Sequence, residues 1–594
     1  MTPPPHLPKI PNAPLMAKGP MGCALEGRAL LNSSIFNKGS AFTTQERIEF
    51  KLQGMLPSAV HTLEQQVERA YGQYKSRKDP MARNTFMASM KSQNEVLYYR
   101  LVERFVKEMF EVIYTPTESQ AIAHYSEIYR RPDGCFLNIH DQDQVEAILA
   151  EWGLPEDVDY IVVTDGEEIL GIGDQGVGGV CISTAKLVLM TLCGGIHPNR
   201  VIPVVLDCGT DNQKLLDDPL YLGLRHKRIR GEEYDRFVDT LVQSVKKLFP
   251  RAVLHFEDFG LSNARKLLET YRLQLPCFND DVQGTGVVTL AAIDAAAHVA
   301  NLKLEDLRMV IFGAGSAGAG IADQFNDTLK HGGRKKEEAK SQIWLVDKLG
   351  LLLESHGDKL TSAQRPYARA EKDWESNHTD SLVDIIREVK PHILIGCSTK
   401  AGAFTEEVVR EMAKHVDRPI IFPLSNPTKL HEAQPEDIYN WTDGKALVAT
   451  GSPFPSVKYN GEEYEVAECN NATAFPGIGL GTVLCRAKRV SDKMLTAAVK
   501  KLAQQSPALK DSKKGLLPDV TDVRRVSQMV AVAVIQQAVE EGLATEIGIP
   551  ETEENLEEWV GLQMWEPVYR ELKKVSVHGA SRAAKGELGI GRQR

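Results

Sequence analysis

The spacing of hydrophobic positions divides the chain into a helical part and a part of alternating elements. From Thr43 to Met109, apolar residues recur at steps of three and four, which predicts α-helices. Thr43 opens the first of these patterns and belongs to a residue type that caps helices. Farther along, short β-branched runs are each followed by polar or glycine-rich residues, with helical patterns between them. The runs are YIVVTDG, VIPVVLDCG, AVLHFED, MVIFGAG, IWLVD, HILIGCS, PIIFPLSN and ALVATGS.

Strands that are apolar on both faces and alternate with helices are typical of parallel sheets covered on both sides. We therefore predict an α/β protein with a helical N-terminal region, a parallel-sheet domain and a Rossmann-type dinucleotide-binding domain. A further amphipathic helix is predicted from Asp522 to Glu541. Ligands of parallel sheets bind at the carboxyl ends of the strands. Most of the runs end there in groups with useful chemistry, such as Asp165 and Glu257.

Composition narrows the class of protein. The 594 residues are 42% hydrophobic and carry a net charge of −10, so the chain can bury a large core and does not have a disordered composition. The acidic balance argues against a nucleic-acid partner. An anionic ligand would need a local cluster of donors, a helix N-terminus or a metal ion. No apolar run approaches roughly 18 residues, so we expect no membrane partner.

Nine scattered cysteines without a C-x-x-C motif predict reduced, intracellular thiols and no zinc site. The first residues, MTPPPHLPKIPNAPLMAKGPMG, are rich in proline, lack an apolar stretch and contain few basic residues. Secretion is therefore not expected. We predict a cytoplasmic location, with the mitochondrial matrix left open.

A G-x-G-x-x-G fingerprint directly follows the run that begins at Met309, and a helical pattern follows it. In this motif the first glycine makes the tight turn, the second lets a pyrophosphate approach the backbone, and the third lets the helix pack close to the sheet. The next run ends at Asp347, the place of an acid that binds a ribose hydroxyl. The predicted dinucleotide contacts are Gly313, Gly315, Ser316, Ala317, Gly318 and Asp347.

A second glycine-rich segment, 171–179, also satisfies the fingerprint pattern. The run before it ends earlier, at Asp165, and no acid follows at the distance expected for a ribose contact. Two interpretations stay open: a loop whose backbone approaches a ligand in a second site, and a purely structural turn.

Two acidic pairs predict a cation site. Glu257 and Asp258 end one run, and Asp280 and Asp281 lie in a loop that opens a helix. Converging carboxylates repel one another unless a cation neutralises them, and oxygen-only ligands favour Mg²⁺ or Mn²⁺. The alternative is a set of helix caps and exposed charges.

Lys186 lies inside an apolar helical pattern, and Tyr114 lies where a helical pattern breaks at Pro116. A lysine on an apolar stretch near carboxylates can lose its proton and act as a base. The alternatives are a lysine that extends to solvent and a tyrosine that belongs to the core.

Segments spread along the chain resemble malic enzymes, and the match runs from about Asn37 to Trp565. The matching segments are NKGSAFT (37–43), LQGMLP (52–57), YTPT (114–117), VTDG (163–166), GIGDQG (171–176), LDCGTDN (206–212), HFEDF (255–259), FNDDVQGT (278–285), SNPT (425–428) and GSPF (451–454). The fungal type is the most similar, through LDCGTDN and the Gly-Leu-Arg segment that begins at Gly223. The resemblance implies oxidation of malate by NAD(P)⁺ at C2, then loss of the β-carboxylate to give pyruvate and CO₂.

The resemblance also implies roles for individual residues. Lys186 is the general base for the C2 hydroxyl, and Tyr114 is the general acid that protonates C3 of enolpyruvate. Asp280 tunes this pair. The implied ligands of Mn²⁺ or Mg²⁺ are Glu257, Asp258 and Asp281, and the implied substrate-carboxylate contacts are Asn426, which also lies at the cofactor, and Asn470.

The chain departs from the family pattern at two places. Many malic enzymes have an arginine in T-D-G-E-R-I-L-G that contacts the substrate carboxylate, and this chain has Glu168 there. Another donor must then hold that carboxylate. Fumarate-activated members use two arginines; Arg69 falls at one position, but Gln93 replaces the other. We therefore do not expect activation by fumarate.

Cofactor choice rests on two positions. Asp347 favours NAD⁺, because a carboxylate binds the ribose 2′-hydroxyl and repels a 2′-phosphate. Gln364 stands where NADP-specific relatives carry lysine, although Arg365 next to it could reach a 2′-phosphate. We predict NAD⁺, with NADP⁺ possible.

The predicted organisation is a flexible arm (1–36), a helical domain (37–132), a substrate and metal domain (133–279, completed by about 470–540), a dinucleotide-binding domain (280–469), and a C-terminal helical segment with a mobile tail (541–594). The resemblance implies a homodimer or homotetramer. Two other functions stay open: a malolactic enzyme, which forms lactate from malate, and a non-catalytic dinucleotide-binding homologue.

Overall fold

The apolar runs of the sequence all form strands. The computed structural model describes residues 19–169, 171–374, 379–426 and 428–576. The strands that match the runs are β3 (Tyr160–Thr164), β4 (Val201–Asp207), β5 (Val253–Phe256), β7 (Met309–Phe312), β8 (Ile343–Asp347), β10 (Ile393–Gly396), β11 (Ile420–Pro423) and β12 (Leu447–Thr450). The predicted α/β fold with a helical N-terminal region and a Rossmann-type domain is confirmed.

The chain divides into two structural units. The first consists of residues 1–166, 174–252 and 546–594, and the second of residues 167–173 and 253–545. The helical N-terminal region belongs to the first unit, and the seven-stranded dinucleotide-type sheet belongs to the second. The boundaries between the predicted domains stay predictions.

Helices make up the N-terminal part of the first unit. They are α1 (Gly27–Leu31), α2 (Thr44–Glu49), α3 (Leu63–Lys75), α4 (Pro80–Gln93), α5 (Glu95–Arg104), α6 (Val106–Ile113), α7 (Thr117–Ala123) and α8 (Tyr125–Ile128). Thr43 caps α2 as predicted: its Oγ1 accepts a hydrogen bond from the backbone N–H of Glu46, whose side chain accepts one from the N–H of Thr43.

The same unit holds a parallel arrangement in which β4 lies between β2 (Cys135–Asn138) and β3. Helix α10 (Val180–Leu192) packs against both β3 and β4, and it is buried along most of its length. The other helices here are α9 (Val145–Ala150), α11 (Gln213–Asp217), α12 (Glu232–Leu248) and α23 (Glu553–Gln563). Because α10 has no polar face, Lys186 in its middle is held inside the protein.

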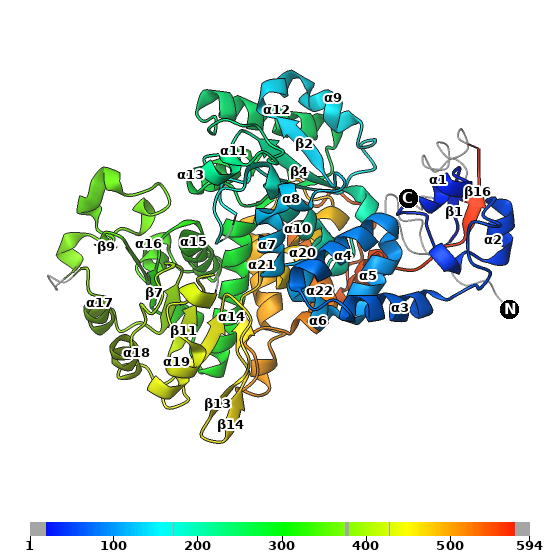
Figure 1. Ribbon diagram of the computed structural model, residues 1–594. Coiled ribbons are helices and arrows are strands. Elements are labelled where there is room, and N and C mark those ends of the chain that lie inside the picture. The colour runs from blue at the N-terminus through cyan, green and yellow to red at the C-terminus, as the bar shows by residue number, and fades with distance from the viewer. Residues whose placement is uncertain (1–18, 170, 375–378, 427, 577–594) are drawn as a thin grey trace. The chain divides into compact units, whose positions relative to one another are not determined.

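Two short strands far apart in the sequence lie side by side in the first unit. Strand β1 (Met21–Cys23), blue in Figure 1, pairs in parallel with β16 (Leu572–Lys574), which is red. Of the predicted flexible arm, residues 1–18 lie outside the described residues, and the remainder carries β1 and α1. Residues 577–594 of the predicted mobile tail also lie outside the described residues.

The second unit is built on a sheet with the strand order β15-β12-β11-β10-β7-β8-β9. The strands are parallel except β9 (Gly350–Leu351), which runs antiparallel to β8. Strand β15 (Ala467–Glu468) forms the other edge. The order of the strands changes direction at β7: the chain continues to β8 on one side and later returns to β10 on the other. A dinucleotide binds at such a switch point, outside the carboxyl ends of the strands.

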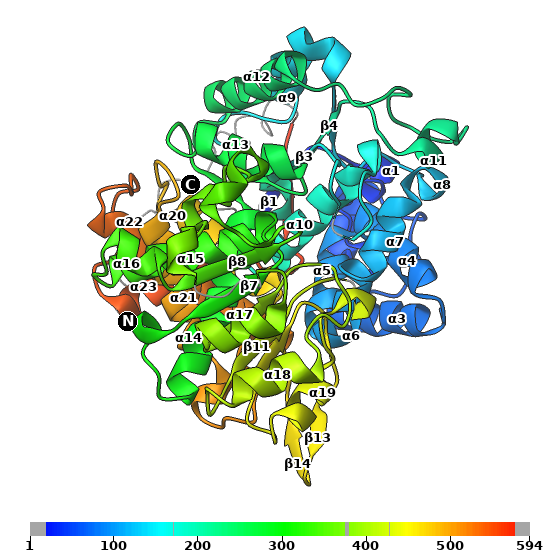
Figure 2. The same cartoon turned by 90° about the vertical axis from the view of Figure 1, so that its left-hand side faces the viewer.

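Helices cover both faces of this sheet. On one face α17 (Leu382–Val389), α18 (Glu406–Ala413) and α19 (Pro435–Trp441) share a hydrophobic core with β7, β10 and β11. Figure 2 shows the ribbons of α17 and α18 near β7 and β11. The helix that follows β7 is α15 (Ser316–His331), which packs against α14 (Thr285–Val299). The remaining elements are α13 (Leu261–Tyr271), α16 (Lys336–Lys340), α20 (Phe475–Leu484), α21 (Asp492–Ala503), α22 (Val523–Glu540) and the hairpin of β13 (Val457–Tyr459) and β14 (Glu462–Tyr464). Helix α22 matches the helix predicted from Asp522.

One helix among the described residues, Asp280–Val299, is long and apolar enough by length and composition to cross a membrane. It contains α14 and is 78% buried against other elements of the protein. Acidic residues at Asp280, Asp281 and Asp294 interrupt its apolar sequence, which is why it did not stand out as an apolar run. Its burial is that of a central core helix.

Candidate active site

The predicted base and acid lie together in the first unit. Lys186 projects from α10 with 2% exposure, and Tyr114, at the C-terminal end of α6, is 7% exposed. The Lys186 Nζ lies 5.5 Å from the centre of the Tyr114 ring. Both side chains are thus inside the protein, and the interpretation of Lys186 as a lysine that extends to solvent is wrong.

A titratable carboxyl follows Tyr114 by one helical turn. The backbone N–H of Glu118 donates to the carbonyl oxygen of Tyr114 at 2.9 Å. Burial raises the pKa of the Glu118 carboxyl to about 7, and a hydrogen bond from Asn84 Nδ2 lowers it by a smaller amount. The segment that carries Tyr114 therefore contains a group that changes charge near neutral pH.

The glycine-rich segment after β3 is packed against the protein itself. A Cβ on Gly176 would overlap the Tyr221 hydroxyl, and a Cβ on Gly179 would lie within 2.9 Å of the Gly166 backbone. The Asp174 carboxylate accepts two hydrogen bonds from the Arg228 guanidinium, at 2.7 and 2.8 Å. These contacts support the structural interpretation of the second glycine motif.

The three predicted metal ligands converge in the second unit. Glu257 and Asp258 follow β5, and Asp281 lies in the π-helical turn Asp280–Gly284, which follows β6 (Cys277–Asn279) and leads into α14. One carboxylate oxygen from each of Glu257, Asp258 and Asp281 lies within 4.8 Å of the other two. The backbone N–H of Asp258 donates to Asp281 Oδ2 at 2.9 Å. Three oxygen donors so close together fit a hard divalent cation such as Mg²⁺ or Mn²⁺.

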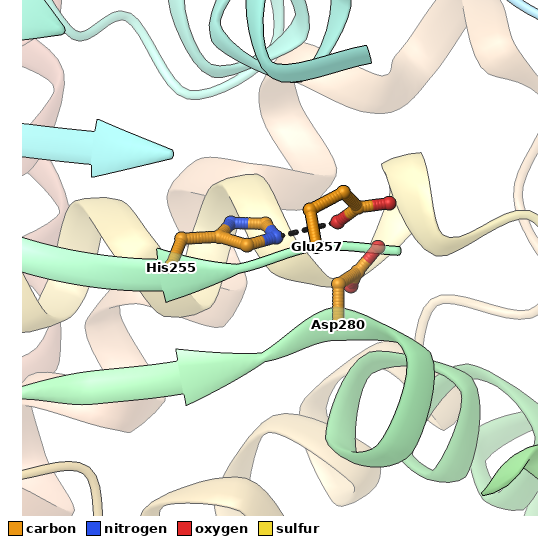
Figure 3. Close-up of side chains that lie close together, drawn as sticks. All are labelled: His255, Glu257 and Asp280. Carbon is orange, nitrogen blue, oxygen red and sulfur yellow. Dashed lines mark hydrogen bonds and ion pairs between the residues drawn. The ribbon is translucent and has the colours of Figure 1, made fainter. Parts of the chain in front are cut away.

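His255 orients the first of these carboxylates. Figure 3 shows the imidazole on β5 directed at Glu257, with Asp280 beside the pair; His255 Nε2 lies 2.7 Å from Glu257 Oε2. Both side chains are at most 1% exposed. The rings of Phe278 and Phe475 pack edge to face against the imidazole, with ring centroids 5.5 and 5.6 Å from its centroid. Such outer partners fix the orientation of metal-ligating groups.

Asp280, the predicted tuning residue, is fully buried at the start of the same turn. Its carboxylate accepts a hydrogen bond from Asn471 Nδ2 at 3.0 Å, and its backbone carbonyl accepts from the same amide at 3.2 Å. Glu168 also lies at this cluster: its backbone N–H donates to the carbonyl oxygen of Asp258. The departure from the family arginine therefore lies on a segment whose backbone contacts the cluster, and the Glu168 side chain is exposed.

The three fingerprint glycines, all in the second unit, form the tight turn, the open approach and the close helix contact that the motif predicts. Gly313, at φ +104°, makes the turn after β7. An added Cβ on Gly315 would meet no atom within 4 Å, so open space faces this glycine. A Cβ on Gly318 would overlap the carbonyl oxygen of Gly313, so α15 lies close against the turn. Ser316 and Ala317 begin α15, whose N-terminus carries partial positive charge.

Asp347 ends β8 as predicted, and its carboxylate is held from two sides. The Ala314 N–H donates to Asp347 Oδ2 at 3.3 Å, and Gln364 Nε2 donates to the same oxygen at 3.0 Å. Gln364 is buried and also donates to the carbonyl oxygen of Ala314. Gln364 therefore connects the turn after β7 to the end of β8.

The two asparagines predicted for substrate lie in different local structures. Asn426 follows β11 and accepts a hydrogen bond from the Ser452 hydroxyl. Asn470 caps a short helical turn: its Oδ1 accepts from the N–H of Ala472 at 2.9 Å, and its Nδ2 donates to Glu468 at 3.1 Å. Their roles toward substrate stay predictions.

Comparison with known proteins decides the family. Residues 91–272 match the family described as "Malic enzyme, N-terminal domain", and residues 282–539 match "Malic enzyme, NAD binding domain". The "NAD-dependent malic enzyme, mitochondrial" of Saccharomyces cerevisiae is 52% identical over 582 residues, covering 95% of this chain and 86% of the relative. The chain belongs to the malic enzyme family. The prediction of an enzyme of this family is confirmed.

Further malic enzymes agree with this assignment. The "NAD-dependent malic enzyme" of Schizosaccharomyces pombe is 46% identical over 562 residues, covering 94% of this chain and 99% of the relative. Among solved structures, the malic enzyme of Entamoeba histolytica matches with a TM-score of 0.54 at 21% identity, covering 91% of this chain and 93% of that one. At that identity the structural match shows the malic enzyme fold alone.

Sequence reasoning missed three residues that organise these sites. His255 had a signal, because residues two apart on a strand share a face, and this places it beside Glu257. Asn471 contacts Asp280 across 191 positions of sequence, and no local pattern indicates such a contact. Glu432, between β11 and α19, is fully buried and also had no local signal.

Proposed function

We propose that the chain catalyses the oxidative decarboxylation of L-malate to pyruvate and CO₂ with reduction of NAD⁺, and that it depends on Mn²⁺ or Mg²⁺. The observation that carries the proposal is the group of three carboxylates, Glu257, Asp258 and Asp281, with oxygens within 4.8 Å of one another. The dinucleotide-type turn at Gly313 and the names of the relatives as NAD-dependent malic enzymes support it.

In this proposal Lys186 takes the proton of the malate C2 hydroxyl, because oxidation to a ketone requires a base. Tyr114 donates a proton to C3 of the enol that decarboxylation leaves, and Asp280 tunes the two groups. A divalent cation held by Glu257, Asp258 and Asp281 supplies Lewis-acid stabilisation of negative charge at the C2 oxygen. Asn426 and Asn470 bind the substrate carboxylate.

A bound cation would explain how an acidic cluster can bind an anionic substrate. Without a cation, Glu257, Asp258, Asp280 and Asp281 would repel malate. Two positive charges on a bound ion reduce this repulsion and give the substrate a local attraction that the overall charge of −10 does not provide.

The test is an assay of the purified protein with L-malate, NAD⁺ and Mn²⁺. We expect equal amounts of NADH, pyruvate and CO₂, and loss of all three when a chelator removes the metal. A malolactic enzyme would release lactate without net NADH. The proposal fails if malate is not consumed, or if consumption continues unchanged after the metal is removed.

The fingerprint glycines allow a prediction that separates folding from cofactor binding. Gly315→Ala is expected to keep wild-type thermal stability, because the added Cβ has free space in the protein, but to weaken NAD⁺ binding by about tenfold or more, because it occupies the pyrophosphate's approach. Gly318→Ala is expected to lower the melting temperature as well. Titration of NAD⁺ and thermal unfolding measure the two effects.

Gly72→Ala in α3, where an added Cβ also meets nothing within 4 Å, is the control: it should leave NAD⁺ affinity unchanged and should not lower the melting temperature, because alanine is favoured over glycine inside a helix. Unchanged NAD⁺ affinity in folded Gly315→Ala would contradict the assignment of the turn.

A second prediction concerns the choice between NAD⁺ and NADP⁺. The wild-type protein is expected to prefer NAD⁺, and Gln364→Lys is expected to raise kcat/KM for NADP⁺ relative to NAD⁺ by about tenfold, because a cation beside Asp347 reduces repulsion of a 2′-phosphate. Arg365→Ala is the matched variant that tests whether the neighbouring guanidinium already reaches a 2′-phosphate. A wild-type preference for NADP⁺ would show that Asp347 does not decide the cofactor.

The compartment and the oligomer stay proposals. The printed name of the S. cerevisiae relative supports the mitochondrial alternative over the cytoplasmic prediction. We propose a homodimer or homotetramer from the family resemblance. Cell fractionation and sedimentation of the purified protein test the two proposals.

A further inference from the structure

A buried glutamate, Glu432, packs against the end of β10, the central strand of the dinucleotide-type sheet. Glu432 lies between the turn Thr428–Leu430 and α19, and its side chain is fully buried. The carboxylate lies directly on the backbone of β10, where a Cβ on Gly396 would overlap it. Glycine at the last position of β10 therefore makes room for this side chain.

Three donors from two strand ends converge on one oxygen of that carboxylate. The Ser398 N–H and the Ser398 hydroxyl, just after β10, donate to Glu432 Oε1 at 2.9 and 2.8 Å. The Ser425 hydroxyl, just after β11, donates to the same oxygen at 2.5 Å. Hydrogen bonds to a carboxylate are among the stronger ones in proteins. Glu432 thus ties the carboxyl ends of β10 and β11 together.

The segment that Glu432 holds forms one side of the switch point. A Cβ on Gly313 would overlap the backbone between Cys397 and Ser398, so the end of β10 packs directly on the first fingerprint glycine. Ser425 directly precedes Asn426, to which the family resemblance assigns contacts with the cofactor and the substrate. The glutamate therefore holds the segments that follow β10 and β11 at the switch point.

The end of β10 also carries backbone strain. Thr399 has φ +57°, a conformation that a β-branched residue rarely adopts. Its N–H donates to Ser425 Oγ at 2.8 Å, and that hydroxyl in turn donates to Glu432. Strained conformations persist where the surroundings hold them, and they concentrate at binding sites. Here the glutamate and Ser425 supply the contacts that hold Thr399.

We propose that Glu432 is a positioning residue for the nicotinamide dinucleotide: it fixes the strand-end segments 397–399 and 425–426 in the geometry that binds NAD⁺, without touching the cofactor's reacting atoms. The inference rests on the proposed use of NAD⁺ at this sheet. We expect loss of the carboxylate to change cofactor affinity specifically, because the carboxylates assigned to the metal follow β5 and β6 and lie outside these two segments.

The test compares Glu432→Ala, Glu432→Gln and a control, Glu411→Ala. Glu411 is a buried glutamate on α18 whose partners include Lys414 and His415. Glu432→Ala is expected to raise the NAD⁺ dissociation constant and KM by about tenfold, with the Mn²⁺ dissociation constant unchanged. Glu432→Gln keeps an oxygen acceptor and should stay within about threefold of wild type. Glu411→Ala should leave NAD⁺ affinity unchanged.

Folded Glu432→Ala with wild-type NAD⁺ affinity would overturn the inference, as would equal losses of NAD⁺ and Mn²⁺ affinity. If that variant does not fold, Ser398→Ala and Ser425→Ala remove the two hydroxyl donors one at a time and leave the Ser398 N–H in place, and each should raise the NAD⁺ dissociation constant by about threefold. Unchanged affinity in both would equally overturn it. A wild-type protein that does not bind NAD⁺ refutes the proposed function itself, whereas unaltered binding by folded variants refutes only the role of Glu432.

Discussion

Lys186→Ala is expected to lower kcat for malate oxidation by about 10²–10⁴-fold while the Mn²⁺ dissociation constant stays at the wild-type value. The buried lysine is the base of the proposed reaction, and it lies 5.5 Å from the ring of Tyr114. It offers no oxygen ligand, so metal binding should not depend on it. Steady-state rates with saturating malate and NAD⁺ measure the first quantity, and electron paramagnetic resonance of free Mn²⁺ measures the second.

Three further variants make the result specific. Lys186→Arg keeps a positive charge that cannot be removed near neutral pH, so it should be as inactive as the alanine variant. Tyr114→Phe removes only the hydroxyl and should lose most turnover with Mn²⁺ binding intact. Lys247→Ala, at an exposed lysine on α12 that pairs with Glu146, is the control and should be fully active. Near-normal turnover in both Lys186→Ala and Tyr114→Phe would contradict the roles assigned to them.

Glu257→Gln is expected to weaken Mn²⁺ binding by more than about a hundredfold and to abolish turnover at ordinary metal concentrations, because changes to the outer partners of metal ligands already cost about 10–100-fold and Glu257 is a proposed ligand itself. Glutamine has the same shape and keeps an oxygen that accepts the hydrogen bond from His255, so the fold around it should survive. Metal binding is measured directly by paramagnetic resonance, independently of activity.

The same variant should show opposite effects on stability with and without metal. In the absence of a cation, Glu257→Gln removes one of several converging negative charges, so the melting temperature should rise. Added Mn²⁺ should stabilise the wild-type protein, which it binds, and should no longer stabilise the variant. Glu269→Gln, at an exposed carboxylate on α13 paired with Arg265, is the control. Wild-type Mn²⁺ affinity in Glu257→Gln would remove this residue from the metal site.

The sequence was most informative where one local pattern defines both structure and chemistry. Continuous apolar runs predicted the buried parallel strands, since such strands have no polar face. The fingerprint predicted a turn, an open approach and a close helix contact, and Gly313, Gly315 and Gly318 have these places in the structure. The acids at the end of β5 and after β6 converged because the carboxyl ends of neighbouring parallel strands lie at one edge of a sheet.

Contacts between segments far apart in the sequence were not predictable in this way. The pairing of β1 with β16 requires the two ends of the described chain to come together, and apolar periodicity does not indicate which distant segments pair. The bond from Asn471 to Asp280 and the bonds from Ser398 to Glu432 depend likewise on the paths of intervening loops. Gln364 was recognised as a cofactor position through the family resemblance, but its hydrogen bond to Asp347 required the structure.

The central claim is that this chain is a metal-dependent malic enzyme that uses NAD⁺. The most direct test is a parallel assay of the wild-type protein with L-malate and Mn²⁺, in which NAD⁺ and NADP⁺ are supplied separately and reduced cofactor and pyruvate are both measured. We expect equal amounts of NADH and pyruvate, a faster reaction with NAD⁺ than with NADP⁺, and no reaction after chelation of the metal. Consumption of malate without reduced cofactor, or no consumption with either dinucleotide, would contradict it.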